Sequence, residues 1–261
     1  MRRPTAVVTG ASAGIGAAFA RVLAARGHDL VVVARSKDRL EALADDLRRE
    51  QSCDVEVLPA DLEEDAGVAR VEARLGDPDR PVELLVNNAG FGTSGRFHEL
   101  PIEPEIAEIG LNVVALVRLS HAALRPMVER GHGGIINVSS VGAFQPTPRS
   151  ATYAATKAFV SSFTQAVHEE LRGTGVKAMV VAPGFTHTEF HLRAGVEHND
   201  RIPEFLWQSP DEVAEIAMKA YERGRASCVT GVWNAVTAAL SKAAPSYVSR
   251  RVAGMVTKRA Y

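Results

Sequence analysis

Residues 5–16 read Thr-Ala-Val-Val-Thr-Gly-Ala-Ser-Ala-Gly-Ile-Gly, and this stretch decides the fold. Its first half is a short run of apolar and β-branched residues, which favours a buried strand. Its second half is rich in glycine, and Ile15, Phe19, Val22 and Leu23 then recur at helical spacing. A strand, a tight turn and a helix in this order indicate the first unit of an α/β fold.

The same alternation continues along the chain. Further apolar runs stand at residues 30–33, 55–58, 82–86, 135–138, 176–181 and 228–230, with helical periodicity between most of them. Strands that are apolar on both faces and separated by helices imply a parallel sheet covered on both sides. We therefore predict a single Rossmann-like domain in residues 1–231, a doubly wound parallel sheet of about seven strands with helices on both faces. Ser209-Pro210-Asp211-Glu212 predicts a helix start with a capping box.

The composition of the chain argues against several classes of protein. The 261 residues are 46% hydrophobic, which is normal for a packed globule, and the net charge of -1 gives no reason to expect nucleic acid as a partner. Cys53 and Cys228 are far apart, so neither a disulfide framework nor a metal knuckle is indicated. The N-terminal apolar run is too short for a signal peptide, and we find none long enough to span a bilayer. We expect a reducing, cytoplasmic setting.

Gly10, Gly14 and Gly16 join the first predicted strand to the first helix. Glycines at such a turn permit positive φ and let a pyrophosphate approach the main chain at the positive end of the helix. Ser12 and Ile15 complete this predicted phosphate site. The spacing differs from the commonest dinucleotide fingerprint, Gly-x-Gly-x-x-Gly.

The loop also matches another class of enzyme. Gly10-x-Ser12-x-Gly14 is the pattern of a nucleophile elbow, in which Ser12 would attack an ester in a serine hydrolase. An elbow needs a preceding backbone loop to complete its oxyanion hole, and only nine residues stand before Gly10. The dinucleotide site is therefore the favoured interpretation.

Basic residues follow the second strand, where an NAD-specific site would offer a carboxylate. Arg35 stands there, with Lys37 and Arg39 close behind. Since a guanidinium favours a 2'-phosphate, we predict NADP(H) in preference to NAD(H). After the third strand, the Asp61 carboxylate could accept a hydrogen bond from the adenine amino group, with Leu62 beside it.

Residues 139–157, SSVGAFQPTPRSATYAATK, carry the predicted chemistry. Tyr153 and Lys157 are one helical turn apart on one face. Lowering the pKa of a phenol from about 10 to about 7 requires roughly 4 kcal/mol, which a lysine charge about 4 Å away supplies at an effective dielectric of about 20. Burial alone would act in the opposite direction. The Ser140 hydroxyl, upstream of this pair, could hold a substrate oxygen.

Residues 186–208 mix polar and aromatic residues without a strong period, which suits a lid over a substrate pocket. The alternative is an ordinary surface excursion. Apolar side chains could line the pocket with Ser140 and favour an apolar carbonyl substrate, unless they belong to the core: Phe91, Val141, Phe144, Phe185, Phe190 and Trp207. His187 and His191 are four residues apart but lack a third ligand unless His198 joins them, so we expect no metal.

In combination these residues resemble the short-chain dehydrogenase/reductase family. The resemblance spans roughly Thr5 to Thr230 and rests on motifs that occur in the family's order: Thr9-Gly10-x-x-x-Gly14-x-Gly16, Asp61, Asn87-Asn88-Ala89-Gly90, Asn112, Ser140, Tyr153-x-x-x-Lys157 and Pro183-Gly184. It implies a doubly wound nucleotide-binding fold and hydride transfer between a nicotinamide and a carbonyl or alcohol carbon. Ala13 departs from the pattern, because NADP-preferring members often carry a basic residue there.

The resemblance also implies roles for individual residues. Tyr153 would be the proton donor or acceptor, Lys157 would lower its pKa and bond the nicotinamide ribose, and Ser140 would orient the substrate oxygen. Asn112 would hold a water in the proton relay, and its amide could also distort the helix that contains it. Asn88, Ala89 and Gly90 would form the adenine-side wall. The segment that closes on the nicotinamide carboxamide would comprise Pro183, Gly184, Thr186 and Thr188.

We therefore predict an NADP(H)-dependent oxidoreductase that acts on an apolar carbonyl or alcohol. A catalytically silent dinucleotide sensor or scaffold is the alternative, against which the intact Ser140, Tyr153 and Lys157 argue. Residues 223–261 contain seven basic residues and no acidic one. We expect the basic amphipathic extension, residues 232–261, to dock on its own subunit or a symmetry mate, with weak membrane-surface contact as the alternative. By resemblance the protein would form a homodimer or homotetramer.

Overall fold

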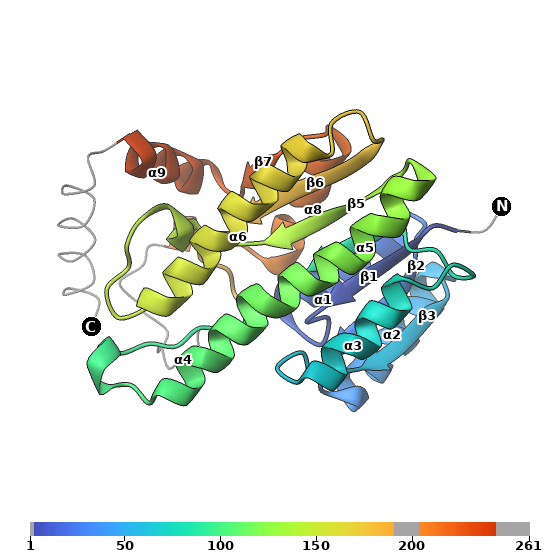
Figure 1. Ribbon diagram of the computed structural model, residues 1–261, viewed down its shortest axis with the longest axis horizontal. Helices are drawn as coiled ribbons and strands as arrows, with labels where there is room; N and C mark the ends of the chain where they lie inside the picture. The colour runs from blue at the N-terminus through green and yellow to red at the C-terminus, as the bar shows by residue number, and fades with distance from the viewer. Residues whose placement is uncertain (1–2, 191–203, 244–261) are drawn as a thin grey trace.

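The computed structural model describes residues 3–190 and 204–243, which form a parallel sheet with helices on both faces (Figure 1). The sheet has seven strands in the order β3-β2-β1-β4-β5-β6-β7, all parallel. The predicted fold class is confirmed.

The bounds of the strands lie within two residues of those that the sequence pattern predicts. Their bounds are β1 Thr5–Thr9, β2 Asp29–Ala34, β3 Val55–Pro59, β4 Leu84–Asn87, β5 Gly133–Val138, β6 Val176–Ala182 and β7 Ser227–Val229. Only β4 begins later than predicted, because Val82 is buried but lies outside the strand ladder. The strand order reverses between β1 and β4, and open α/β sheets bind ligands at such a switch point, outside the carboxyl ends of the strands.

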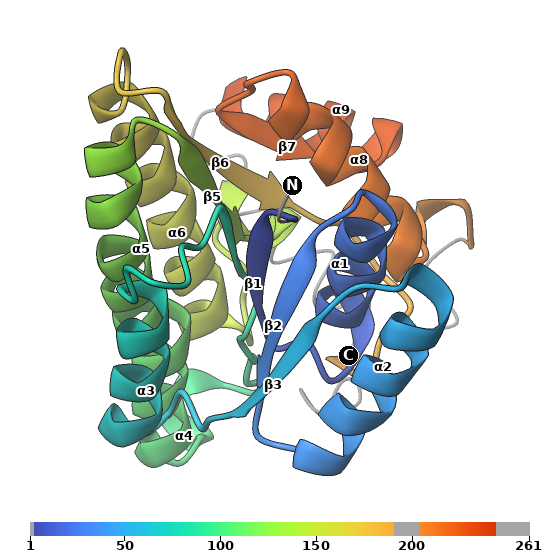
Figure 2. The same cartoon turned by 90° about the vertical axis from the view of Figure 1, so that its right-hand side faces the viewer.

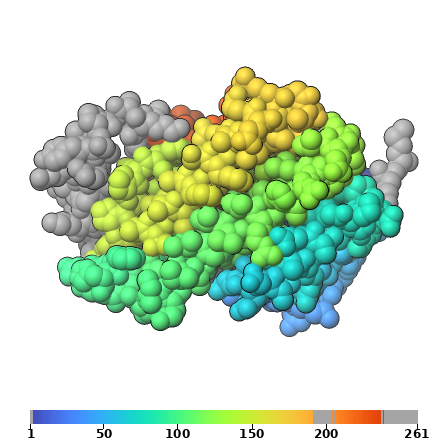
Figure 3. Space-filling view, viewed as in Figure 1, coloured from blue at the N-terminus to red at the C-terminus, as the bar shows by residue number. Residues whose placement is uncertain are grey.

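Two layers of helices cover the sheet (Figure 2). One layer contains α1 (Gly14–Ala25), α2 (Lys37–Gln51) and α8 (Pro210–Glu222). The other contains α3 (Asp65–Leu75), α4 (Ile102–Ile109), α5 (Leu116–Arg130) and α6 (Ala151–Glu170), of which α3, α5 and α6 lie side by side on the face shown in Figure 3. Along β1, Ala6 and Val8 pack into the first layer and Val7 into the second, which explains why the strand is apolar on both faces.

The helices α4 and α5 are joined by a π-helix, η2 (Gly110–Ala115). The resulting helical stretch, Ile102–Arg130, is 29 residues long and by length and composition alone could cross a membrane. Here α5 packs against β4, β5 and α3. Arg118 of α5 forms ion pairs with Asp65 and Glu72 of α3, each at 2.7 Å. This helix is thus part of the layer that covers the sheet.

Shorter elements complete the described chain: the 3-10 helices η1 (Phe97–Glu99), η3 (Val141–Phe144) and η4 (Glu204–Leu206), and α9 (Val232–Ala243). Helix α9 contacts β7 and η3. It forms the first part of the predicted C-terminal extension, whereas residues 244–261 lie outside the described residues, as do residues 191–203 of the predicted lid. The division of the chain at residue 231 stays a prediction.

The predicted capping box at the start of α8 is confirmed. Ser209 Oγ accepts a hydrogen bond from the Glu212 backbone N–H at 3.2 Å, and Glu212 Oε2 accepts from the Ser209 N–H at 2.8 Å. Pro210 occupies the first helical position. The box satisfies two backbone donors that the helix itself leaves without partners.

Replacing Ser209 by alanine removes this cap, and we expect the free energy of unfolding to fall by about 1 kcal/mol. Urea denaturation measures the change. Ser36 is a matched control, because it stands at the N-cap of α2 without a side-chain capping bond, and Ser36→Ala should change stability much less. Equal effects of the two substitutions would contradict the assignment.

Candidate active site

The loop between β1 and α1 has a backbone that requires glycine. Gly10 and Gly14 have φ of 66° and 55°, in the left-handed region that residues with a Cβ rarely adopt. A Cβ on Gly16 would lie 2.2 Å from the Gly10 carbonyl oxygen, and one on Gly10 would lie 2.7 Å from Asn88 Nδ2. The bare backbone at the start of α1 fits the close approach of a phosphate.

Thr9 joins this loop to the one after β4. Its Oγ1 accepts hydrogen bonds from the backbone N–H groups of Asn88 and Ala89, both at 3.0 Å. Asn88 Nδ2 in turn donates to the Thr9 carbonyl at 3.0 Å. The structure thus brings the predicted adenine-side wall against the glycine loop, at the switch point of the sheet.

Charged side chains surround the end of β2. The Arg35 guanidinium lies 2.9 Å from Glu63 Oε1 and 3.9 Å from Asp61 Oδ2. Arg39 pairs with Glu189 at 3.0 Å, an ion pair that joins α2 to the segment after β6. Arg35, Arg39 and Asp61 are therefore gathered where the sequence predicted the adenine half of a dinucleotide, and Leu62 is buried beside them.

A hollow of about 720 Å³ adjoins the glycine loop, and its lining includes Ser12, Gly14, Arg39, Thr188 and Trp207. The Thr188 methyl lies 3.0 Å from the place that a Cβ on Gly14 would take. Trp207, predicted to line the substrate pocket, lies in this hollow and stacks on His187 with ring centroids 4.7 Å apart. The hollow, the glycine backbone without side chains, and the guanidinium groups of Arg35 and Arg39 fit a dinucleotide that carries an additional phosphate.

Ser140, Tyr153 and Lys157 meet at the carboxyl end of β5. Tyr153 and Lys157 lie on α6, with Lys157 Nζ 5.7 Å from the centre of the Tyr153 ring. The Lys157 side chain is buried, and its Nζ donates to the Val138 carbonyl at 3.0 Å. Ser140 begins η3, where its Oγ accepts from the Gly142 N–H at 3.1 Å and the side chain acts as a hydrogen-bond partner of the Tyr153 phenol. The predicted Ser-Tyr-Lys group is thus assembled.

The protonation of this group differs from the prediction. Burial raises the pKa of Tyr153 to about 12, although the hydrogen bond from Ser140 opposes this shift. Burial also lowers the pKa of Lys157 to about 8. The sequence predicted that the lysine lowers the pKa of the phenol. That direction is not found in this structure, because loss of solvation is the largest cause acting on the phenol.

Asn112 lies in the π-helix, so the helix that contains it is distorted, while its amide bonds to other segments. Its Nδ2 donates to the Phe91 carbonyl at 2.8 Å and to Thr156 Oγ1 at 3.1 Å, and its Oδ1 accepts from the Phe91 N–H at 3.2 Å. The amide therefore ties η2 to the loop after β4 and to α6. A Cβ on Gly90 would lie 2.7 Å from Asn112 Oδ1 and 3.3 Å from Lys157 Nζ, so both side chains reach the same glycine.

The aromatic side chains predicted for the substrate pocket are half-buried around these elements. Phe190 lies against Tyr153 with ring centroids 5.4 Å apart, and Phe185 against Trp207 at 5.6 Å. Val141 and Phe144 belong to η3, and the Phe91 backbone is held by Asn112. The Phe190–Tyr153 contact provides an apolar wall next to the phenol.

The segment after β6 is held by contacts that include one unpredicted residue. The Val141 N–H donates to the Pro183 carbonyl at 2.9 Å, and Thr186 Oγ1 to the Gly184 carbonyl at 3.0 Å. A Cβ on Gly184 would lie 2.0 Å from Asn234 Nδ2 of α9. Asn234 therefore fixes the path of this segment through close contact. Nothing around residue 234 in the sequence indicates such a contact.

Two buried carboxyl groups next to the site were also missed. Glu105 and Glu108 of α4 are 3% and 0% exposed. The Thr93 hydroxyl lies 2.5 Å from Glu105 Oε1 and 2.9 Å from Glu108 Oε2, and the Thr93 N–H donates to Glu108 Oε2 at 3.0 Å. Thr152, which precedes Tyr153, donates its hydroxyl proton to Glu105. Burial, reinforced by the charge of Glu105, raises the pKa of Glu108 to about 7.

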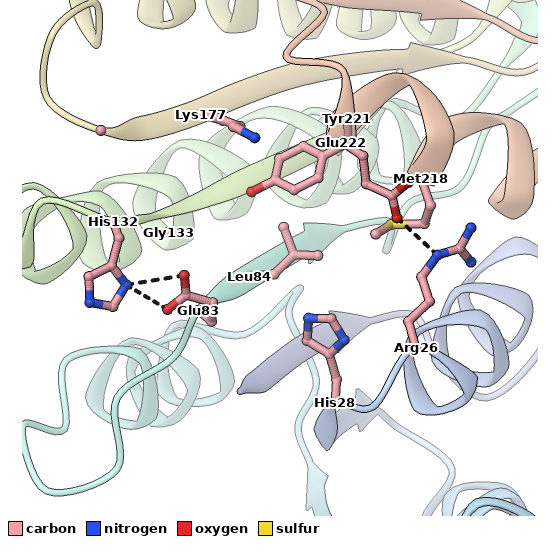
Figure 4. Close-up of a pocket in the computed structure, with 11 residues that line it drawn as sticks. Arg26, His28, Glu83, Leu84, His132, Gly133, Lys177, Met218, Tyr221 and Glu222 are labelled. Atoms are coloured by element: carbon pink, nitrogen blue, oxygen red, sulfur yellow. Dashed lines mark hydrogen bonds and ion pairs between the residues drawn. The ribbon is translucent and has the colours of Figure 1, made fainter. Parts of the chain in front are cut away.

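A second hollow, of about 490 Å³, lies at the opposite ends of the strands (Figure 4). Its lining includes Arg26, His28, Glu83, Leu84, His132, Gly133, Lys177, Met218, Tyr221 and Glu222. Gly133 and Leu84 are the first residues of β5 and β4. In Figure 4, His132 pairs with Glu83 at 2.8 Å and Arg26 pairs with Glu222 at 3.0 Å. Parallel sheets bind ligands at the other end, where Tyr153 lies.

No metal centre emerges from the described part of the chain. Among residues 3–190 and 204–243, no three His, Cys, Asp or Glu side chains are grouped closely enough to hold an ion. His187 instead pairs with Glu204 at 3.2 Å. The other two histidines of the predicted alternative, His191 and His198, lie outside the described residues.

The fold and the residues gathered at the carboxyl ends of its strands define a dinucleotide-binding oxidoreductase of the doubly wound α/β class. The profile of the family described as short chain dehydrogenase matches residues 4–198. The chain belongs to this family, whose members are dehydrogenases and reductases that act on alcohol and carbonyl groups. This family assignment favours the dinucleotide interpretation of the loop that contains Ser12 over the hydrolase interpretation.

Individual relatives agree with this assignment. A short chain dehydrogenase of Pseudocercospora fijiensis is 38% identical over 193 residues, and the match covers 71% of this chain but 60% of that one. Among solved structures, the short-chain dehydrogenase from Sphingobium yanoikuyae in complex with NADPH is 41% identical, with a TM-score of 0.83 over 90% of this chain and 93% of that one. The bulky-bulky ketone specific alcohol dehydrogenase from Comamonas testosteroni is 34% identical, with a TM-score of 0.79 over 92% of both chains.

The raised pKa of Glu108 predicts that the free energy of unfolding depends on pH. Because its pKa rises from 4.5 to about 7 on folding, the folded protein binds more protons than the unfolded one between these values. The free energy of unfolding should therefore fall as pH rises from 4.5 to about 7, by roughly 3 kcal/mol from this group. Urea denaturation of the wild type and of Glu108→Gln across this range isolates the effect as their difference.

Glu103→Gln is the matched control, since Glu103 is an exposed glutamate on the same helix. It should follow the pH dependence of the wild type. A Glu108→Gln variant with an unchanged pH dependence would show that the carboxyl titrates normally.

Proposed function

We propose that the protein is an NADP(H)-dependent oxidoreductase that transfers a hydride between nicotinamide and the carbonyl or alcohol carbon of an apolar substrate. The observation that carries this proposal is the meeting of Ser140, Tyr153 and Lys157 beside the glycine loop, at the carboxyl ends of parallel strands. A catalytically silent dinucleotide sensor would have no need of this group.

Tyr153 is the general acid and base in this proposal. The bound nicotinamide supplies or accepts the hydride at the substrate carbon. In the direction of reduction, the Tyr153 hydroxyl gives its proton to the substrate oxygen, and the Ser140 hydroxyl holds the same oxygen in place. A pKa of about 12 keeps the phenol protonated at neutral pH, as proton donation requires. In oxidation the phenolate form of Tyr153 accepts the proton instead, and the positive charge of Lys157 favours that form.

Asn112 has a positioning part in the proposal. Its side-chain amide is fully engaged with Phe91 and Thr156, so it fixes the loop after β4 against α6, the helix that carries Tyr153 and Lys157. The π-helix around it changes the backbone bonding of the helix next to the site, a feature that is frequent at functional sites.

Preference for NADP(H) is supported by the charges at the end of β2. Arg35 and Arg39 are partly exposed guanidinium groups whose partners in the structure include the carboxylates of Glu63 and Glu189. The 2'-phosphate of NADP(H) would be a stronger acceptor for these guanidinium groups than a carboxylate, because charge-assisted hydrogen bonds of arginine to phosphate are often bidentate. The similar dehydrogenase from Sphingobium yanoikuyae is described in complex with NADPH.

The substrate in this proposal is apolar. Phe190 contacts the Tyr153 ring, and Val141 and Phe144 follow Ser140 directly on η3. Such side chains favour a ketone or alcohol with hydrocarbon groups on the reacting carbon. The similar alcohol dehydrogenase from Comamonas testosteroni is described as bulky-bulky ketone specific.

A homodimer or homotetramer is also part of the proposal. Ile106 of α4 is 60% exposed and Phe159 of α6 is 43% exposed. Apolar side chains of this size on neighbouring helices support a contact between subunits. We place the protein in the cytoplasm and keep contact of the basic tail with a membrane surface as the alternative to subunit docking.

Replacing Tyr153 by phenylalanine removes the proton donor and keeps the ring. We expect kcat to fall by a factor of about 10² to 10⁴ while the Kd for NADPH changes little. A panel of apolar ketones followed by NADPH absorbance measures kcat, and cofactor fluorescence measures Kd. Tyr221→Phe is the control, because this phenol lines the hollow at the opposite end of the sheet. Full activity of the Tyr153 variant would remove the phenol from the mechanism.

Replacing Arg35 by alanine should discriminate between the two cofactors. We expect the Kd for NADPH to rise about tenfold or more and the Kd for NADH to change little, because only NADPH carries the additional phosphate. Arg49→Ala is the control, since Arg49 is an exposed arginine at the far end of α2 that pairs with Asp46. Equal weakening of both cofactors by the Arg35 substitution would contradict the preference.

A further inference from the structure

The contacts of Thr93 bear on the protonation of the Glu105 and Glu108 carboxyl groups. The Thr93 hydroxyl lies within hydrogen-bond distance of one carboxyl oxygen from each glutamate, at 2.5 Å and 2.9 Å. A hydroxyl has a single proton, so it can donate to only one of the two oxygens. The other contact is a hydrogen bond only when that carboxyl group is protonated and donates to the hydroxyl. The geometry thus places two buried carboxyl groups around one hydroxyl, an arrangement that favours a single proton on the pair.

Glu108 is the member of the pair that carries this proton. Glu105 accepts hydroxyl contacts on both of its oxygens, from Thr93 and from Thr152, which stabilises its charged form. Glu108 Oε1 is buried without a hydrogen-bond partner among the described residues, which penalises the charged form. The pKa of Glu108, raised to about 7, agrees with this distribution.

The charge of Glu108 acts on the residues of the proposed reaction. Helix α4 packs against α6, which carries Tyr153 and Lys157. When ionised, Glu108 raises the pKa of Lys157, opposing the effect of burial, and also raises the pKa of Tyr153. The ionisable groups that act on Glu108 are Glu105 on its own helix and Lys157 on α6. This effect is electrostatic, so it does not require Glu108 to transfer a proton itself.

We propose that Glu108 is a positioning residue for the reaction proposed above. In its ionised form it is the buried negative charge that keeps Lys157 in the ammonium form and keeps the proton on Tyr153. Glu105 contributes by anchoring Thr152 in the first turn of α6, directly before Tyr153. As pH rises through about 7, Glu108 ionises and extends the pH range in which the phenol can protonate a carbonyl oxygen. The inference rests on the proposed function for its effect on turnover.

The experiment follows Lys157 itself. NMR of protein labelled with ¹³C at the lysine Cε reports the titration of Lys157, which Lys157→Arg assigns. In the wild type we expect an inflection near pH 7 from Glu108 in addition to the titration of the amine near pH 8. In Glu108→Gln the first inflection should disappear, and the midpoint of Lys157 should fall by about one pH unit.

Turnover supplies the second readout. In Glu108→Gln the basic limb of the kcat/KM profile for ketone reduction should move to lower pH by about one unit, with the Kd for NADPH unchanged. Glu103→Gln removes a charge from the exposed side of α4 and should behave as the wild type in both measurements. A merely structural role would instead lower kcat/KM equally at every pH.

The proposal is overturned if Lys157 shows no inflection near pH 7 in the wild type, an outcome that does not require Glu108→Gln to fold. It is also overturned if Glu108→Gln leaves the Lys157 titration unmoved, or if Glu103→Gln shifts it equally. Absence of turnover with any ketone would refute the proposed function instead, and the NMR titration would still decide whether Glu108 controls the charge of Lys157.

Discussion

The arrangement of this site depends on the hydrogen bonds of the Thr9 hydroxyl. Thr9 lies at the end of β1, and its Oγ1 accepts hydrogen bonds from the backbone N–H groups of Asn88 and Ala89. These bonds hold the loop after β4 against the glycine loop. Both loops leave the sheet at the point where the strand order reverses. Because the backbone is fixed on both sides of this point, the groups that follow β4 and β5 meet the start of α1 in one defined geometry.

Much of this arrangement could be predicted from the sequence, because it follows from local patterns. Buried parallel strands are apolar on both faces, and all seven were visible as short apolar runs. The glycine loop was recognisable because only glycine permits φ of 66° at residue 10. Tyr153 and Lys157 were placed on one face by helical spacing alone. Ser140 could be added because parallel strands end at the same edge of a sheet.

The remaining features depend on contacts between distant segments. Helix α4 shows this most clearly, because hydrophobicity alone would bury Ile102, Ile106 and Ile109 and expose its glutamates. The structure does the reverse, since Thr93 and Thr152 provide hydrogen bonds that allow Glu105 and Glu108 to be buried. The pKa of Tyr153 was predicted in the wrong direction for a similar reason. Spacing reveals the neighbouring charge, whereas loss of water depends on the whole surrounding fold.

The ion pair between Arg39 and Glu189 forms part of the lining of the hollow beside the glycine loop. Both side chains are about half exposed, and ion pairs in such surroundings contribute only about 0 to 1 kcal/mol. Opening this contact is therefore inexpensive, and moderate salt weakens it further. The ion pair therefore joins α2 to the segment after β6 only weakly, and an incoming anion can replace the Glu189 carboxylate on Arg39 at little energetic cost.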